Sequence, residues 1–302
     1  MRVMARIAAV LTAGALAAGC SSFHLPRTGE PVVLTTFTVL ADIARNVAGE
    51  HLRVESLTKP GSEIHGYEPT PGDMKRAAKA DLILDNGMNL EAWFDQFVAD
   101  LDAERVTVSQ GVAPVPITSD AYAGKPNPHA WMSPLNVQTY VDNMVTAFIR
   151  MAPEHESAFR DNAARYKLRL QEVHDELVGA LSDLPRRQRA LVTCEGAFSY
   201  LARDAGLSES FIWPVNAERQ ATPQQITQVI EYVRDHEVPA VFCESTVSDA
   251  PMQRVVEATG ARFGGVLYVD SLSTGDGPVP TYLDLIRHDA ETIAAALTGS
   301  SP

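Results

Sequence analysis

The chain has 302 residues, of which 45% are hydrophobic and 21% are charged, and this composition excludes disordered and fibrous proteins. With 38 acidic against 25 basic residues the formal net charge is −13, so the sequence lacks the basic surface that binds nucleic acid. The length is enough for two domains of ordinary size, and an acidic surface favours cations as ligands.

The N-terminus has the layout of a secretory signal peptide. Arg2 and Arg6 precede an apolar run over 7–18, and the small residue Gly19 follows it. The run is shorter than the roughly 20 apolar residues that a membrane-spanning helix needs, and nothing later in the chain approaches that length. We therefore expect residues 1–19 to be removed on export and the mature protein not to be an integral membrane protein.

The residues around Cys20 resemble a bacterial lipobox, in which the cysteine becomes the acylated N-terminus of the mature chain. The matching sequence is Leu-Ala-Ala-Gly-Cys over 16–20. Residues 20–30 contain serine, proline, threonine and glycine, and they predict a tether between the membrane and the fold. Lipidation of Cys20 predicts anchoring at the extracytoplasmic face of the cell membrane. The alternative is an ordinary signal peptidase site beside an incidental cysteine.

From Pro31 onward, short apolar runs alternate with amphipathic stretches, a pattern that predicts βα units and parallel sheets. The alternation occurs twice, before and after a helical middle region. In the first set we expect strands at 32–37, 52–58, 81–85 and 105–109, and helices at 38–49, 70–80 and 89–103. In the second set we expect strands at 190–194, 211–215, 240–243 and 263–269, and helices at 197–206, 222–237, 249–259 and 280–297.

Two helices fill the middle region. Ser133 and Pro134 supply an N-cap and a first-turn proline for the first helix, which should end near Met151 because Pro153 blocks its continuation. In the second, longer helix, apolar residues recur at spacings of three and four and form one stripe. These residues are Phe159, Ala163, Tyr166, Leu170, Val173, Leu177, Leu181 and Leu184.

These elements predict an α/β fold of two lobes, each with a parallel sheet flanked by helices, bridged by one long helix. We place the N-terminal lobe at 31–152, the bridging helix at 153–185 and the C-terminal lobe at 186–302. A long helix with a single apolar stripe is suited to bracing two lobes against each other. The alternative is a surface helix that belongs to one lobe.

Two histidines lie in loops that prolines make rigid. His65 lies in the proline- and glycine-rich segment 61–73, directly after an expected strand, where open α/β sheets place their ligands. His129 lies between Pro128 and the start of a helix. Most of the other histidines lie in charged helical settings that indicate exposure to solvent. His65 and His129 are therefore candidate ligand-binding residues.

Two acids stand at the ends of apolar strands in the second half of the chain. Glu195 lies where an expected strand gives way to a helix, and Asp270 closes the apolar run 265–269. A carboxylate is costly to bury without a partner charge or a metal ion, so both positions indicate a binding role. The alternative is that each acid caps the helix that follows it.

The segments that carry these four residues occur in an order typical of one family. Tyr-Glu-Pro follows at 67–69 and an aspartate at 73, Pro-His-Ala-Trp spans 128–131, Glu-Gly-Ala-Phe-Ser-Tyr spans 195–200, and Asp-Ser occupies 270–271. Across nearly the whole mature chain the sequence resembles the metal-binding lipoproteins of the cluster A-I, or TroA-like, solute-binding family, specifically its manganese and iron branch. One departure is Glu63 with Ile64, where the family often has Asp-Pro, and this could loosen the loop before His65.

The resemblance implies that His65, His129, Glu195 and Asp270 are metal ligands, two from each lobe, with the ion in the cleft between the lobes. It also implies a binding protein, and not an enzyme, that delivers the ion to an ABC permease and its ATPase. We expect a monomer. The alternatives from other classes are a metallohydrolase, which would need an open metal position, and a surface lipoprotein with a role in cell adhesion.

Manganese is the favoured ion. Two neutral imidazoles and two carboxylates balance the charge of one divalent cation, and the carboxylates can each bind through both oxygens, which suits Mn(II) or Fe(II). Zn(II) prefers four tetrahedral nitrogen or sulfur donors. Zinc-specific relatives usually have histidine where Glu195 stands and often a histidine-rich loop between the first two ligands, and the stretch 111–128 contains no histidine. Fe(II) and Zn(II) remain the alternatives.

Two further cysteines lie beside acids at the ends of expected strands. Cys194 directly precedes Glu195, and Cys243 ends another strand. We expect both to be small core residues. The alternatives are a disulfide, which an exported protein can form if the Cα atoms lie within about 7 Å of each other, and thiolate ligation, which would favour zinc.

Overall fold

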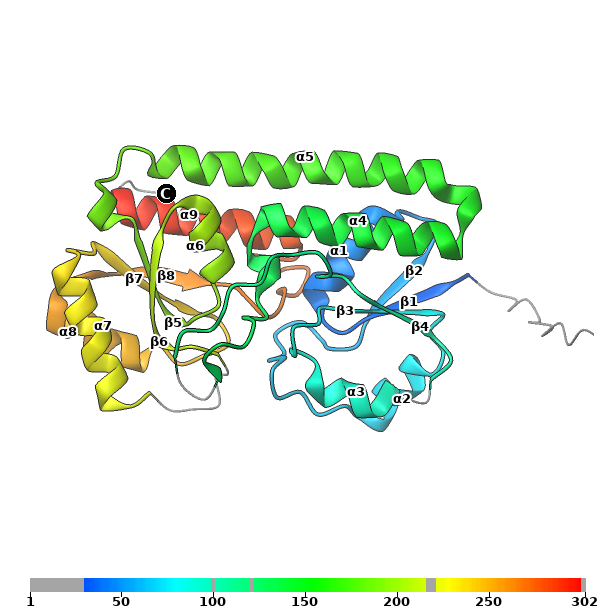
Figure 1. The fold of residues 1–302 in the computed structure, drawn as a ribbon, viewed down its shortest axis with the longest axis horizontal. Helices are drawn as coiled ribbons and strands as arrows, with labels where there is room; N and C mark the ends of the chain where they lie inside the picture. The colour runs from blue at the N-terminus through cyan, green and yellow to red at the C-terminus, as the bar shows by residue number, and fades with distance from the viewer. Residues whose placement is uncertain (1–29, 99–100, 120–121, 216–220, 300–302) are drawn as a thin grey trace, which may run out of the picture.

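The computed structural model describes residues 30–98, 101–119, 122–215 and 221–299. The expected signal peptide at 1–19, the lipidation site Cys20 and all but the last residue of the tether lie outside these ranges. Within them, no helix combines the length and apolar character needed to cross a membrane. Figure 1 shows two α/β lobes side by side, with one long helix running along both.

The N-terminal lobe is built on a four-stranded parallel sheet in the order β2-β1-β3-β4. Its strands are β1 (Val32–Thr35), β2 (Arg53–Ser56), β3 (Leu82–Asp85) and β4 (Glu104–Thr107). Its helices are α1 (Thr38–Ala48), α2 (Pro71–Ala77) and α3 (Ala92–Val98). All the expected elements of this half are present, although most are shorter than the sequence pattern suggests.

Successive side chains of these strands point to opposite faces of the sheet, and different helices cover the two faces. Leu34 and Ile83 point to one face and pack with Ala77 of α2 and Phe94 of α3. Val33 points to the other face, into the main core beneath α1. This period of two is what a strand buried on both faces requires.

The C-terminal lobe contains two parallel strand pairs. The strands are β5 (Ala190–Glu195) with β6 (Ser208–Trp213), and β7 (Ala240–Glu244) with β8 (Arg262–Leu267). The helices are α6 (Ser199–Ala205), α7 (Pro223–Asp235), α8 (Ala250–Thr259) and α9 (Tyr282–Thr298). β5 and β7 lie side by side, although their ladders are separate. β6 starts three residues earlier than expected. Its first half is polar, and we expected strands where the sequence has apolar runs.

Two consecutive helices connect the lobes. α4 (Pro134–Met151) begins as expected, with the Ser133 side chain accepting from the Asn136 N–H and the proline in its first turn. α5 (Glu156–Leu181) packs against α1 and α4 of the N-terminal lobe and against α9 of the C-terminal lobe, and all three lie beneath it in Figure 1, so it contacts both lobes. Most of the expected stripe is buried along it. The described residues also include short 3-10 helices at η2 (Ala130–Met132), η3 (Pro153–His155) and η4 (Arg186–Gln188).

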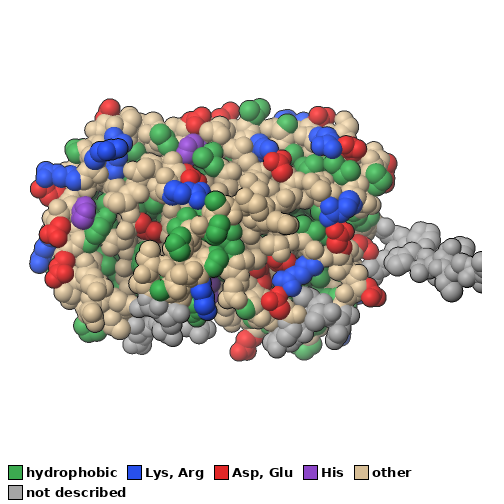
Figure 2. Space-filling model, viewed as in Figure 1, with side chains coloured by type: hydrophobic (Ala, Val, Ile, Leu, Met, Phe, Trp, Pro, Cys, Tyr) green, Lys and Arg blue, Asp and Glu red, His purple; other side chains and the backbone are tan. Residues whose placement is uncertain are grey.

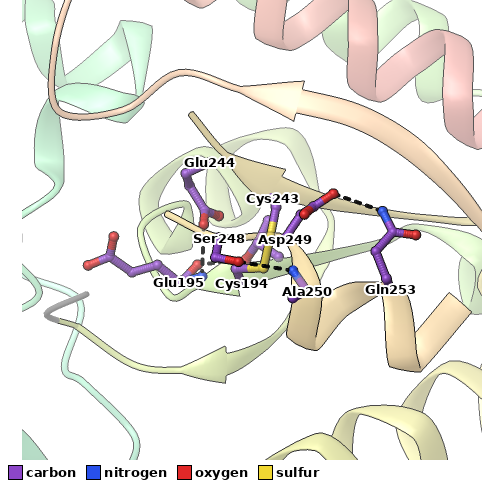
Figure 3. Close-up of a disulfide and its surroundings, with 9 residues drawn as sticks. Cys194, Glu195, Cys243, Glu244, Ser248, Asp249, Ala250 and Gln253 are labelled. Atoms are coloured by element: carbon purple, nitrogen blue, oxygen red, sulfur yellow. Dashed lines mark hydrogen bonds between the residues drawn. A yellow bond between two sulfur atoms is a disulfide. The ribbon is translucent and has the colours of Figure 1, made fainter. Parts of the chain in front are cut away.

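Cys194 of β5 and Cys243 of β7 form a disulfide, shown in Figure 3. The expectation of unpaired core cysteines is therefore wrong, although both residues are fully buried. Because the two strands lie side by side and each cysteine directly precedes the acid that ends its strand, the Cα atoms come within 4.9 Å of each other. The sulfurs consequently offer no thiolate to a metal ion.

Candidate metal-binding site

The four residues predicted as ligands converge between the lobes. His65 comes from the loop between β2 and α2, His129 from the turn before η2, Glu195 from the end of β5 and Asp270 from the loop after β8. The Nε2 atom of His65 lies 2.9 Å from Nε2 of His129, 3.5 Å from Oε1 of Glu195 and 3.9 Å from Oδ1 of Asp270. His129 Nε2 lies 3.6 Å from the same Glu195 oxygen. The donor atoms of His65, His129 and Glu195 all lie within 4.8 Å of one another, and those of Glu63, His65 and Asp270 form a second such group that shares His65. A cation bound by all four predicted residues would therefore draw Asp270 toward the first group.

The site is almost dry. The side chain of His65 is 6% exposed, that of His129 is fully buried, and those of Glu195 and Asp270 are 1% exposed. Burial lowers the pKa of His65, with the nearby Glu63 opposing the effect, and it lowers the pKa of His129 further, with help from the His65 charge. Both imidazoles are therefore neutral near pH 7 and can offer a lone pair.

The two acids repel each other. Burial raises the pKa of Asp270 well above its ordinary value, and the charges of Glu195 and Glu63 raise it further. The Oδ1 atom of Asp270 is buried and accepts no hydrogen bond from the described residues. A divalent cation at this point would balance the charges that now oppose each other.

The loop that carries His65 is fixed from both ends. Asp73 accepts hydrogen bonds from the Tyr67 hydroxyl at 2.9 Å and from the Thr70 N–H at 2.7 Å, and it closes a capping box at the start of α2. On the other side, the Glu63 carboxylate accepts from the His65 N–H at 2.9 Å. Glu63 thus ties the loop together, in contrast to the loosening expected from this departure.

Hydrogen bonds join the ligand loops of the two lobes directly. The Gly61 N–H in the His65 loop donates to the hydroxyl of Ser271, the neighbour of Asp270, at 2.7 Å. The Trp131 indole, two residues after His129, donates to the carbonyl of Val269 at 3.0 Å. The relative positions of the four side chains are therefore set by contacts between lobes as well as by α5.

Three polar residues at the site, of which Asn127 and Glu244 are buried and Glu63 is partly exposed, were missed by the sequence interpretation as partners of the ligands. Glu63 has a carboxylate oxygen within 4.8 Å of both His65 and Asp270 donor atoms. Asn127 bonds the ring of His129. Glu244 accepts from the N–H of Glu195 at 3.2 Å. The repeated Cys-Glu pair at the ends of β5 and β7 is the one sequence signal that could have indicated Glu244.

A cavity of about 180 Å³ opens beside His65 and gives the site a side facing outward. Met88, Leu90 and Pro128 line it with apolar surface, and Lys125 lies at its edge. Met88 has a positive φ of 54°, an uncommon backbone conformation for a residue other than glycine.

The fold and the sequence belong to a known class of metal-binding proteins. Residues 33–296 match the family model described as ZnuA, zinc-uptake complex component A, periplasmic, and the chain belongs to that family.

Among individual proteins, it is 50% identical over 263 residues to the iron-binding protein YfeA of Yersinia pestis, covering 87% of this chain and 85% of that protein. It is 32% identical to the manganese ABC transporter substrate-binding lipoprotein PsaA of Streptococcus pneumoniae, with 88% of each chain covered.

Solved structures show the same architecture. The Mn-bound periplasmic metal-binding protein of Candidatus Liberibacter asiaticus superposes with a TM-score of 0.84 at 36% identity, covering 89% of this chain and all of that one. The periplasmic zinc-binding protein TroA of Treponema pallidum gives a TM-score of 0.80 at 26% identity, covering 89% of this chain and 99% of that one. The expected family and the two-lobed fold with its long connecting helix are thereby confirmed.

Proposed function

We propose that this protein is the extracytoplasmic metal-binding component of an ABC-type importer and that it captures Mn(II), with Fe(II) as the nearest alternative. The observation that carries the proposal is the convergence of His65, His129, Glu195 and Asp270 in one dry cluster between the lobes. Support comes from relatives along nearly the whole chain, one named for iron, others for manganese and for ABC transport.

The donor set favours Mn(II) or Fe(II) over Zn(II). Two imidazole nitrogens and two carboxylates that can each bind through both oxygens supply up to six donors, and harder ions of higher coordination number accept them. Zinc still competes because its intrinsic affinity for such donors is higher, so selectivity depends on geometry and on metal supply. The disulfide leaves Cys194 and Cys243 without the thiolates that would favour zinc.

Capture and delivery require the protein to stay near the membrane and to signal that it is loaded. We propose that Cys20 anchors the mature chain at the extracytoplasmic face and that the loaded form docks on a permease served by an ATPase. The metal would join donors from both lobes, and its preference for the closed arrangement would drive a modest closure. Four protein ligands, with both carboxylates binding through two oxygens, would leave no open coordination position, so we expect no hydrolytic turnover.

Calorimetric titration of metal-free protein with Mn(II) tests the proposal. We expect one site in the parent protein and loss of binding in Asp270→Ala. A matched control is Asp183→Ala, which removes an exposed acid in the loop after α5. Equal Mn(II) binding by the parent protein and Asp270→Ala would contradict the proposed ligand set.

A further inference from the structure

The Asn127 side chain bonds both a histidine of the cluster and the backbone next to the glutamate of the cluster. It is 2% exposed and lies between Pro126 and Pro128. Its Oδ1 atom accepts from the N–H of His129 at 3.0 Å and lies 2.8 Å from the Nδ1 atom of the same residue. Its Nδ2 atom donates to the carbonyl of Gly196 at 2.6 Å.

The two backbone partners fix the orientation of the Asn127 amide. The His129 N–H can only donate and the Gly196 carbonyl can only accept, so the oxygen must face His129 and the nitrogen must face Gly196. An amide oxygen next to Nδ1 requires a proton on that ring nitrogen. The proton is then absent from Nε2 of neutral His129, which is the atom that faces Glu195.

A second arm of the same amide continues into the C-terminal lobe. Asn127 Nδ2 also donates to the hydroxyl of Ser199 at 3.2 Å, and that hydroxyl donates to the carboxylate of Glu209 at 2.6 Å. The hydrogen bonds run in one direction from the amide to a buried acid. A flip of the amide would place its oxygen against the Gly196 carbonyl, so the Gly196 contact opposes the flip.

Both ends of the connection are rigid. The Asn127 N–H donates to the Val115 carbonyl at 2.8 Å, and its own carbonyl accepts from the Tyr200 hydroxyl at 2.7 Å. A Cβ atom on Gly196 would meet the Pro214 carbonyl oxygen at 2.6 Å, so this backbone fits only glycine without a shift. The amide therefore connects two backbone segments that have little freedom of their own.

We infer that Asn127 is a positioning residue for metal capture: it holds His129 in the tautomer that leaves Nε2 free, and it ties His129 to the Glu195 segment across the lobes. The inference rests on the proposed metal-binding function. Residues that orient a metal-ligating histidine change metal affinity by about 10- to 100-fold when they are removed. Without Asn127 the proton can move to Nε2, where it blocks the ion.

The tautomer can be read without any metal, by nitrogen-15 NMR of histidine-labelled, metal-free protein. The His129 signals are assigned by their absence in His129→Gln. In the parent protein we expect protonated Nδ1 and unprotonated Nε2. In Asn127→Ala we expect a mixture of tautomers, together with Mn(II) affinity about 10- to 100-fold weaker in calorimetry. Asn143→Ala is the matched control, because Asn143 also bonds backbone carbonyls but lies on α4 away from the cluster.

Asn127→Asp tests the bond to His129 separately from the bond to Gly196. It also replaces the alanine variant if that variant does not fold. The carboxylate keeps an acceptor for Nδ1 of His129 but faces the Gly196 carbonyl with an oxygen in place of a donor. We expect the parent tautomer with weakened Mn(II) binding. The inference is overturned if Asn127→Ala keeps the parent tautomer, or if it loses the tautomer and binds Mn(II) as the parent does. Failure of the parent protein itself to bind Mn(II) would instead contradict the proposed function.

Discussion

The backbone N–H of Glu195 donates a hydrogen bond to Oε2 of Glu244 across 3.2 Å, so one of the two acids proposed to bind metal is held by a third acid. Glu244 is 2% exposed, and burial raises its pKa to about 8. At neutral pH the Glu244 carboxyl is therefore mostly protonated. This proton lets three acids lie close together in the C-terminal lobe before a cation arrives.

Stability of the metal-free protein should fall as pH rises from about 6.5 to 8. Burial raises the pKa of Glu91 and of Glu209 to about 7 and that of Glu244 to about 8, from ordinary values near 4.5. In this window the folded state binds more protons than the unfolded state, so the free energy of unfolding decreases with rising pH. The lowered pKa values of His65 and His129 act in the opposite direction, but only below about 6.5.

Denaturant unfolding at several pH values measures this slope. Glu209→Gln should flatten it, because one carboxyl oxygen of Glu209 is buried without a hydrogen bond among the described residues and an amide there carries no charge. Glu231→Gln, on the exposed face of α7, should leave the slope unchanged. Stability that is constant or that rises over the window would show that these carboxyls are ionised in the folded state.

Mn(II) binding should release protons. The pKa of Asp270 is raised mainly by burial and also by the charges of Glu195 and Glu63, so in the metal-free site this carboxyl stays protonated to higher pH than an ordinary aspartate, and a bound ion would displace that proton. Calorimetric titrations in buffers with different ionisation enthalpies measure the number released. A binding enthalpy that does not depend on the buffer would contradict a protonated metal-free site.

Removing the disulfide should weaken the fold. Cys194 and Cys243 are separated by 49 residues, and closing a loop of this length stabilises the folded state by about 4 kcal/mol in the chain-entropy treatment. Unfolding of the double variant Cys194→Ser/Cys243→Ser should occur at a correspondingly lower denaturant concentration. Addition of a reductant should destabilise the parent protein and leave the double variant unaffected. A parent protein with two alkylatable thiols after unfolding would refute the pairing.

Much of the fold could be predicted from the sequence, because strands such as β3, β5 and β7 are apolar runs and helices such as α2, α4, α7 and α9 begin with a side-chain N-cap. Thr70 and Ser133, each followed by a proline, mark helix starts that the structure reproduces. The predicted start of β6 is three residues too late, because Ser208, Glu209 and Ser210 look like loop residues. Glu209 is tolerated inside only because the Ser199 hydroxyl, from another element, bonds it.

The sequence predicted which residues form the site but not the contacts that connect them. Rigid proline-framed loops identify His65 and His129 locally, whereas the pairing of Cys194 with Cys243 depends on β5 lying beside β7. In the same way, the reach of Asn127 from one lobe to Gly196 of the other depends on tertiary packing. No local pattern in one sequence specifies such contacts.

On the face shown in Figure 2, acidic and basic side chains are interspersed. The proposed function depends on one cation binding between the lobes. Anomalous diffraction at the manganese absorption edge, from crystals of the full mature chain grown with Mn(II), tests it most directly. We predict a single strong peak within bonding distance of His65, His129, Glu195 and Asp270. A peak that excludes any of these four side chains, or one located elsewhere with this cluster empty, would contradict the account.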